Sequence, residues 1–74
     1  MATPAVTVDV REMLCAQALA VVARQIGQLR PDDVAAVYYA ADDVKHDLIA
    51  WANDRGYQIA LVAPGTLHVQ RGYR

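Results

Sequence analysis

The 74-residue sequence contains a single cysteine, Cys15, and only two histidines, His46 and His68. One cysteine excludes an internal disulfide bond. Two histidines far apart in the chain do not match the ligand spacing of a structural zinc site. We therefore expect a fold that depends on no disulfide bond and no metal ion.

Charge of either sign is also scarce. The chain has seven Lys and Arg against eight Asp and Glu, a formal net charge of −1. Nucleic-acid-binding domains usually carry a basic face or stripe, so this balance argues against direct nucleic-acid binding. The sequence also lacks a stretch of apolar residues long enough to span a membrane and a signal-peptide pattern at residues 1–5. We therefore expect a cytoplasmic protein with no membrane association.

What the chain has in quantity is hydrophobic residues, which make up 55% of it. A domain of this length buries only ~60% of the surface that its unfolded chain exposes, so nearly every apolar residue must contribute to the core. No linker, repeat or low-complexity segment interrupts the sequence. We expect one domain over residues 1–74.

Hydrophobic periodicity in the first half predicts a strand, a helix and a second strand. Apolar residues alternate with polar ones over residues 6–10, which indicates a half-buried strand. From Cys15 they recur every three or four residues, and the helix they predict ends between Gly27 and Arg30. The members of this stripe are Cys15, Leu19, Val22, Ile26 and Leu29. The nearly continuous apolar run over 34–40 then indicates a buried, central strand.

The second half predicts a helix and a hairpin. Asp42 and Asp43 are N-cap candidates for a helix that ends at Arg55–Gly56. Residues 58–63 and 66–70 have strand patterns, and Pro64–Gly65 between them predicts a tight turn.

The predicted order is thus β-α-β-α-β-β. It corresponds to a two-layer α/β sandwich in which a four-stranded mixed sheet is covered on one face by two helices. A ferredoxin-like domain would instead run β-α-β-β-α-β, so the terminal hairpin distinguishes the two folds.

Cys15 has two interpretations. At the junction of strand and helix, backbone N–H groups and the helix dipole would lower its pKa from the usual ~8.5 and favour a thiolate. Free cysteine is also among the most frequently buried residues, and in that case Cys15 is a small apolar core residue without chemistry.

Residues 8–18, VDVREMLCAQA, lie without a gap over a pattern close to Leu-Asp-Leu-Arg-Gly-Leu-x-Cys-Pro-x-Pro. This segment resembles the start of the TusA/SirA-like sulfur carriers, small proteins that shuttle a persulfide on one cysteine. Residues 29–34, 47–52 and 67–71 resemble later segments of the family, in the same order. The resemblance places Cys15 at the sulfur-bearing position.

The chain departs from the family pattern around that cysteine. Glu12 replaces a glycine, and the Cys-Pro-x-Pro motif is degenerate as Cys15-Ala16-Gln17-Ala18. These changes favour helix, so Asp9 and Glu12 could form a capping box that starts the helix near Val10 or Arg11 and places Cys15 more than one turn inside. Arg11 would favour a Cys15 thiolate and Glu12 would disfavour it, which makes both candidate modulators of the thiol pKa.

Three functions are open. The resemblance implies a sulfurtransferase-like relay protein, in which Cys15 accepts sulfur from a cysteine desulfurase or rhodanese and passes it to a protein acceptor without a cofactor. The alternative is a degenerate paralogue that acts as a non-catalytic binding or regulatory subunit. The third is an unrelated small α/β domain, which would need a concave ligand pocket.

Other polar residues have structural explanations. Helix capping and first-turn carboxylates account for Asp42, Asp43 and Asp47. Arg71 and Arg74 are expected to form a frayed basic end.

Overall fold

The structure is a computed structural model and describes residues 4–30 and 33–71. Its elements are β1 (Val6–Asp9), α1 (Cys15–Gly27), β2 (Val34–Tyr38), α2 (Asp42–Asp54), β3 (Gln58–Ala63) and β4 (Thr66–Gln70). This order matches the predicted β-α-β-α-β-β, and the terminal hairpin excludes the ferredoxin-like arrangement. Pro31 and Asp32, within one of the segments that resemble the sulfur carriers, lie outside the described residues.

The four strands form one mixed sheet in the order β1-β2-β4-β3. Strand β2 pairs parallel with β1 and antiparallel with β4, and β4 pairs antiparallel with β3. The prediction of a buried, central strand is confirmed, because β2 has a partner on each side and all of its residues except Tyr38 are buried. Strands β1 and β3 form the two edges.

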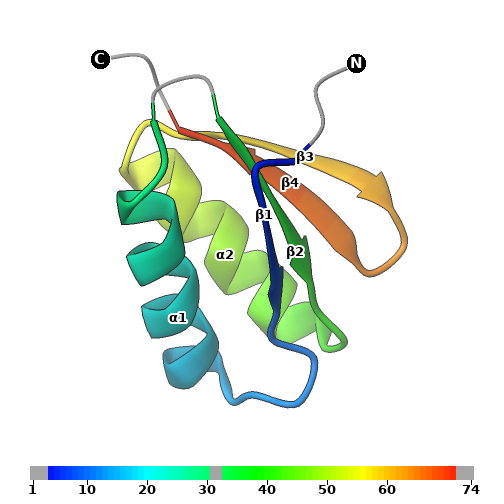
Figure 1. The fold of residues 1–74 in the computed structure, drawn as a ribbon. Coiled ribbons are helices and arrows are strands. Elements are labelled where there is room, and N and C mark those ends of the chain that lie inside the picture. The colour runs from blue at the N-terminus through cyan, green and yellow to red at the C-terminus, as the bar shows by residue number, and fades with distance from the viewer. Residues whose placement is uncertain (1–3, 31–32, 72–74) are drawn as a thin grey trace.

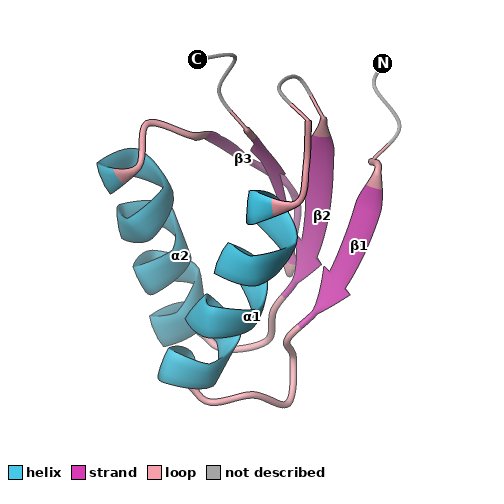
Figure 2. Cartoon of the chain, turned by 60° about the vertical axis from the view of Figure 1, so that its left-hand side comes forward, coloured by secondary structure: helices cyan, strands magenta, loops and turns pink. Residues whose placement is uncertain are grey.

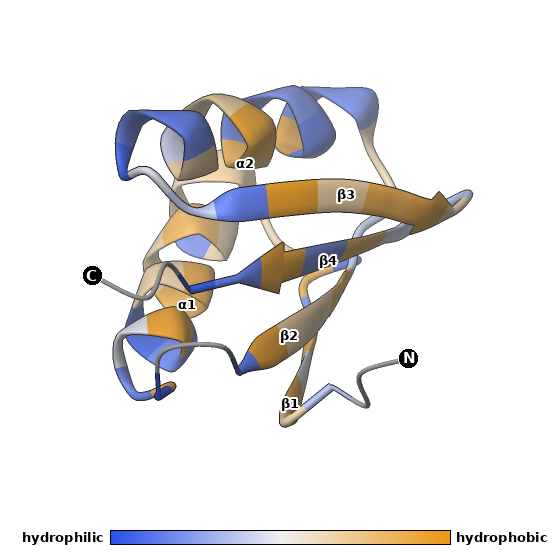
Figure 3. Ribbon diagram, turned by 90° about the horizontal axis from the view of Figure 1, so that it is seen from above, coloured by the Kyte–Doolittle hydropathy of each residue, from blue (hydrophilic) through white to orange (hydrophobic). Residues whose placement is uncertain are grey.

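Both helices lie on the same face of the sheet, which gives the predicted two layers (Figures 1 and 2). Helix α1 packs against β1 and β2, and α2 packs against β3. Figure 3 shows α2 above β3 and β4, on the side of the molecule away from β1. The largest side chains with less than 2% exposure are Ile26, Leu48, Leu67, Val10, Val22, Val37 and Val69.

Helix α1 buries a slightly different stripe from the predicted one. Its buried residues are Ala18, Val22 and Ile26, while Cys15 and Leu19 are only half-buried. The line of closest approach to the sheet therefore passes through Ala18, beside Cys15. Cys15 packs against the rim of the core and keeps part of its surface accessible.

Helix α2 begins one residue earlier than the N-cap prediction required. Ala41 is the last extended residue and its carbonyl accepts the first helical bond, from the Lys45 N–H at 3.1 Å. Asp42 and Asp43 are therefore first-turn residues and not the N-cap. The predicted end is confirmed, since Gly56 follows the helix with a φ of 76° that favours glycine.

The turn between β3 and β4 requires its glycine. Gly65 has a φ of 80°, and a Cβ atom there would lie 3.3 Å from the Tyr39 carbonyl oxygen. With Pro64 before it, this is the geometry of a type II turn. The Gly65 carbonyl also accepts a hydrogen bond from the Tyr39 N–H at 3.0 Å, so the turn is tied to the end of β2.

Arg71, which was expected to fray, instead caps α1. Its Nη1 donates hydrogen bonds to the carbonyl oxygens of Gly27, at 3.2 Å, and Leu29. A cation at a helix C-terminus satisfies free carbonyl groups and complements the dipole. The segment after β4 thus holds the end of α1, whereas Arg74 lies outside the described residues.

Candidate functional site

The loop between β1 and α1 determines where Cys15 lies. Leu14 is extended, with φ −72° and ψ 159°, and its carbonyl accepts the Ala18 N–H at 2.8 Å. Leu14 is therefore the N-cap and Cys15 is the first helical residue. The N–H groups of the first turn have no partner within the helix.

The alternative start near Val10 is wrong. Val10 is committed to the sheet, because its N–H donates to the Tyr38 carbonyl at 2.9 Å and its side chain is 1% exposed. Asp9 also forms no capping box with Glu12. Its Oδ1 accepts the backbone N–H of Arg11 at 3.1 Å, and its two carboxylate oxygens bind the Arg11 guanidinium at 3.0 and 2.7 Å.

The thiol of Cys15 has a carboxylate partner on the other helix. Its Sγ donates a hydrogen bond to Oδ2 of Asp47, in α2, at 2.6 Å. This bond, desolvation and the negative charges of Asp47 and Asp43 raise the Cys15 pKa from 9.0 to about 11. These contacts disfavour the thiolate that the position at the helix start was expected to favour.

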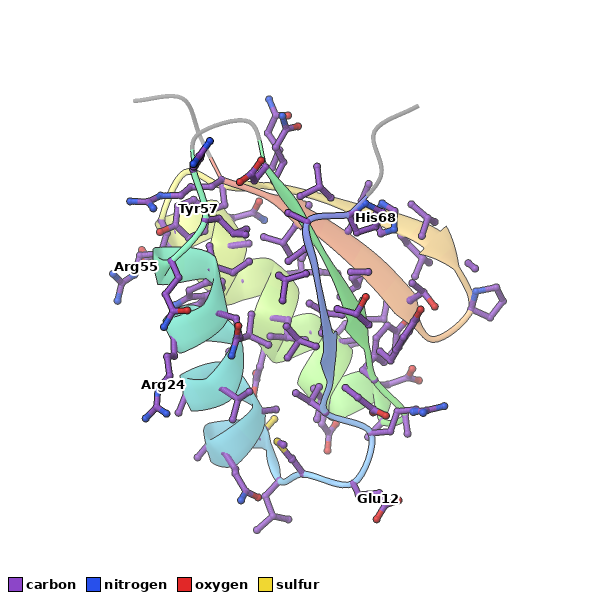
Figure 4. All side chains as sticks on the ribbon, in the orientation of Figure 1. Glu12, Arg24, Arg55, Tyr57 and His68 are labelled. Carbon is purple, nitrogen blue, oxygen red and sulfur yellow. The ribbon has the colours of Figure 1, made fainter. Side chains whose placement is uncertain are left out.

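Arg11 and Glu12 were expected to modulate the Cys15 pKa, and neither is among the groups that shift it. The hydrogen bonds between Arg11 and Asp9 raise the pKa of Arg11 and hold that of Asp9 at about 2, below its usual 3.8. The Arg11 guanidinium also lies 5.7 Å from the centre of the Tyr38 ring. Glu12 extends outward from the loop (Figure 4). The charges that shift the Cys15 pKa are instead those of Asp47 and Asp43.

The surface next to Cys15 is apolar. Leu14 is 80% exposed, the largest exposed fraction among the large hydrophobic residues in the described part of the chain. Met13, before it, packs against the core and is half-buried. A partly accessible thiol thus lies between an exposed leucine on its own loop and an aspartate on the neighbouring helix.

Asp47 is the residue of this site that sequence reasoning assigned to another role. Helix capping accounted for all three aspartates at 42–47, yet only Asp42 and Asp43 lie in the first turn of α2. The sequence signal was the i, i+4 spacing of Asp43 and Asp47, which places both on one helix face. That spacing does not indicate which element this face meets.

No group of three His, Cys, Asp or Glu residues that could hold a metal ion occurs within residues 4–30 and 33–71. Two surface depressions flank β3, with volumes of about 440 and 570 Å³, and Cys15 lines neither.

None of the described helices has the length and apolar character needed to cross a membrane. No protein-family model and no curated protein matches this chain.

Proposed function

We propose that this protein is a TusA/SirA-like sulfur relay protein of the cytoplasm, where free thiols are kept reduced. Cys15 accepts a persulfide sulfur from a donor protein, a cysteine desulfurase or rhodanese, and transfers it to a protein acceptor. The observation that carries the proposal is the position of Cys15, a partly accessible thiol at the start of α1 beside the exposed Leu14.

Leu14 supports a docking role for this surface. Leucine is a poor N-cap residue, and Ser, Asp or Asn would accept an N–H bond there that Leu14 leaves unmade. With 80% of its surface exposed, its side chain contributes little to the core. An apolar side chain that serves neither helix nor core fits a contact with a protein that brings sulfur to the adjacent thiol.

The transfer step needs no redox partner. The Cys15 thiolate attacks the outer sulfur of the donor persulfide, an S–S bond forms on Cys15, and the donor's S–S bond breaks. The donor cysteine leaves as a thiolate and takes up the proton that Cys15 lost. The same exchange, with Cys15 as the donor, delivers the sulfur to an acceptor thiolate.

Asp47 makes Cys15 slow to react until a partner binds. While its carboxylate accepts the thiol proton, the thiolate required for attack is scarce at neutral pH. A donor that places a Lys or Arg side chain against Asp47 would draw the carboxylate away and lower the Cys15 pKa. Reaction with the correct donor is then favoured over reaction with small oxidants.

The test is the mass of the protein after incubation with a cysteine desulfurase and cysteine. We expect a gain of about 32 Da, one sulfur atom, that a reductant removes and that Cys15→Ser abolishes. Cys15→Ser is a matched control because its hydroxyl can still donate to Asp47. Absence of the gain in the wild-type protein would contradict the proposal.

A second comparison separates docking from thiol chemistry. Leu14→Ser should slow sulfur uptake from the desulfurase but leave uptake from a small inorganic polysulfide unchanged, because only the protein donor uses the apolar contact. An equal loss with both donors would mean that Leu14 acts on the thiol and not on docking.

The raised pKa of Cys15 favours one other candidate, a binding or regulatory subunit that retains the docking surface without transfer. Such a protein would bind the desulfurase and gain no sulfur. Binding together with slow alkylation of Cys15 in both the free and the bound protein would identify it.

A further inference from the structure

The two edges of the sheet differ in length and charge. Edge strand β1 has four residues and ends at the Asp9–Arg11 ion pair. Edge strand β3 has six residues and lies within residues 56–70, which contain no Asp, Glu, Lys or Arg. Charged side chains and short strands protect an edge against pairing with another chain, so β3 lacks two protections that β1 has.

Strand β3 presents unused backbone groups at this edge. The Tyr39 N–H, at the end of β2, donates to the Gly65 carbonyl. Because hydrogen-bonded residues alternate along an antiparallel pair, the residues of β4 that bond to β2 are Leu67 and Val69. The intervening residues of β4 bond to Ala60 and Gln58 of β3. The N–H and C=O groups of Ile59 and Leu61 therefore point away from the sheet.

Apolar side chains accompany these groups. Leu61 and Val62 are 53% and 51% exposed and are, with Leu14, the large hydrophobic residues that remain exposed among the described residues. A depression of about 570 Å³ lies along the open face of β3, and Ala60, Val62 and His68 are among the residues that line it. Both faces of β3 thus offer apolar surface beside the free edge.

We propose that β3 pairs antiparallel with β3 of a second copy of this chain, which joins two four-stranded sheets into one of eight strands. The register that uses the free backbone groups is centred on Ala60, which lies opposite Ala60 of the other copy on the two-fold axis. Ile59 of each copy then lies opposite Leu61 of the other. Each Ile59–Leu61 pair exchanges both backbone hydrogen bonds.

Self-pairing is favoured by symmetry and by the absence of charge. In a two-fold antiparallel pair, each residue meets a residue on the same face, so the exposed Leu61 packs against Ile59 and Val62 lies beside Gln58 at the rim of the depression. No like charges meet along the paired strands themselves, because residues 56–70 contain no Asp, Glu, Lys or Arg.

The irregularity in β3 limits the contact without preventing it. The register with β4 shifts between Leu61 and Ala63, so Val62 is bulged. Bulges twist an edge away from a partner. Residues 58–61 precede the bulge and are regularly paired with β4. Because this length of strand buries little area, we expect a reversible dimer.

Pairing through β3 leaves the sulfur site open. Helix α1 packs on β1 and β2, at the opposite end of the sheet from β3 (Figures 1 and 3). Cys15 and Leu14 therefore remain accessible in both copies. The inference is independent of the proposed sulfur relay, and a dimer without sulfur uptake, or uptake without a dimer, would separate the two.

Sedimentation velocity over about 10 µM to about 1 mM tests the pairing, since weak interfaces dissociate in this range. We expect the wild-type mass to rise toward twice that of one chain. Ala60→Lys places two lysines opposite each other on the axis and should weaken dimerisation roughly tenfold or more. Thr7→Lys, an exposed position on edge strand β1, is the matched control and should dimerise like the wild type.

A charge swap tests both the register and the identity of the partner. Ala60→Lys and Ala60→Glu should each dimerise more weakly than the wild type when alone, and should form a tighter heterodimer when mixed, because opposite charges then meet. Circular dichroism of each variant checks that the monomer is folded. A wild-type protein that stays monomeric up to about 1 mM would overturn the proposal. So would Ala60→Lys dimers as tight as the wild type, or open-ended assembly in place of a closed pair.

Discussion

The two helices of this protein begin in the same way and differ in the charges that surround their first turns. Both follow an extended apolar residue, Leu14 before α1 and Ala41 before α2, and neither side chain accepts a backbone N–H. Helix α2 has Asp42 and Asp43 in its first turn. Helix α1 has no acidic residue there, and the carboxylate nearest its start, Asp47, belongs to α2.

The difference shows that a helix start is not enough to ionise a thiol. A dipole contribution of about 0.3–1 kcal/mol corresponds to less than about one pKa unit. The hydrogen bond to Asp47, with desolvation and the charge of Asp43, moves the Cys15 pKa the other way, from 9.0 to about 11. A single charged acceptor on a neighbouring helix therefore outweighs the free N–H groups of the helix that carries the sulfur.

The largest expected effect comes from removing that acceptor. Asp47→Asn should lower the Cys15 pKa toward 9, so the thiolate fraction at pH 8 rises from about 0.1% toward the value of about 10% that a pKa of 9 gives. A thiolate of lower pKa is a weaker nucleophile, and the net gain in alkylation rate should be about tenfold. Iodoacetamide kinetics followed by mass measure it.

Asp43→Asn is the matched control for this prediction. Asp43 acts on Cys15 through its charge alone, so its loss should accelerate alkylation much less. Equal rates in the wild type and Asp47→Asn would show that Asp47 does not hold the thiol proton in solution.

Leu14→Ser would give α1 the N-cap that it lacks. A serine oxygen can accept an N–H of the first turn, and we expect the free energy of unfolding to rise by about 1 kcal/mol. Urea denaturation measures the gain. Leu14→Ala, which removes the side chain without adding an acceptor, is the control and should not show it. A loss of stability in both variants would mean that Leu14 contributes to the core.

Ala41→Ser makes the same change at α2 and should stabilise less, by about 0.5 kcal/mol. The first turn of α2 already has two carboxylates, Asp42 and Asp43, that interact favourably with its N–H groups. Urea denaturation beside Leu14→Ser compares the two helices directly. A larger gain in the free energy of unfolding for Ala41→Ser than for Leu14→Ser would contradict the idea that the first-turn carboxylates already stabilise the start of α2.

The last prediction is a pH dependence of stability at the alkaline end. The folded protein favours the protonated Cys15, so this contribution to stability is present below pH 9 and is lost as the pH rises from 9 through about 11. The difference in melting temperature between the wild type and Cys15→Ser should decrease over that interval, because a serine does not titrate. A difference that stays constant from pH 8 to 11 would contradict the raised pKa.

The architecture could be predicted because each element carries its own signal. The valines of β1 alternate, β2 is apolar throughout, and glycines at 56 and 65 mark the places where φ becomes positive. These are local properties of the chain. The start of α1 was harder to predict, because Asp9 and Glu12 match a capping box. It is ruled out by the hydrogen bond from the Val10 N–H to the Tyr38 carbonyl and by the contacts of Asp9 with Arg11.

The site could be predicted only in part. Cys15 was the obvious candidate because it is the one cysteine. Its partner Asp47 is separated from it by 32 positions and meets it only because the two helices pack side by side. The contacts of Arg71 with the end of α1 have the same origin. Contacts between distant elements depend on how the helices are rotated on the sheet, which no local pattern determines.

The place of β4 in the sheet has a consequence for how the chain acquires its structure during synthesis. Strand β4 follows β3 in the sequence yet lies between β3 and β2. Until residues 66–71 have left the ribosome, β3 has no strand beside it and the C-terminal carbonyls of α1 lack Arg71. A nascent chain that ends at the Pro64–Gly65 turn can therefore form helices but no complete sheet. We therefore expect the sheet to close only once β4 is free to insert between β2 and β3.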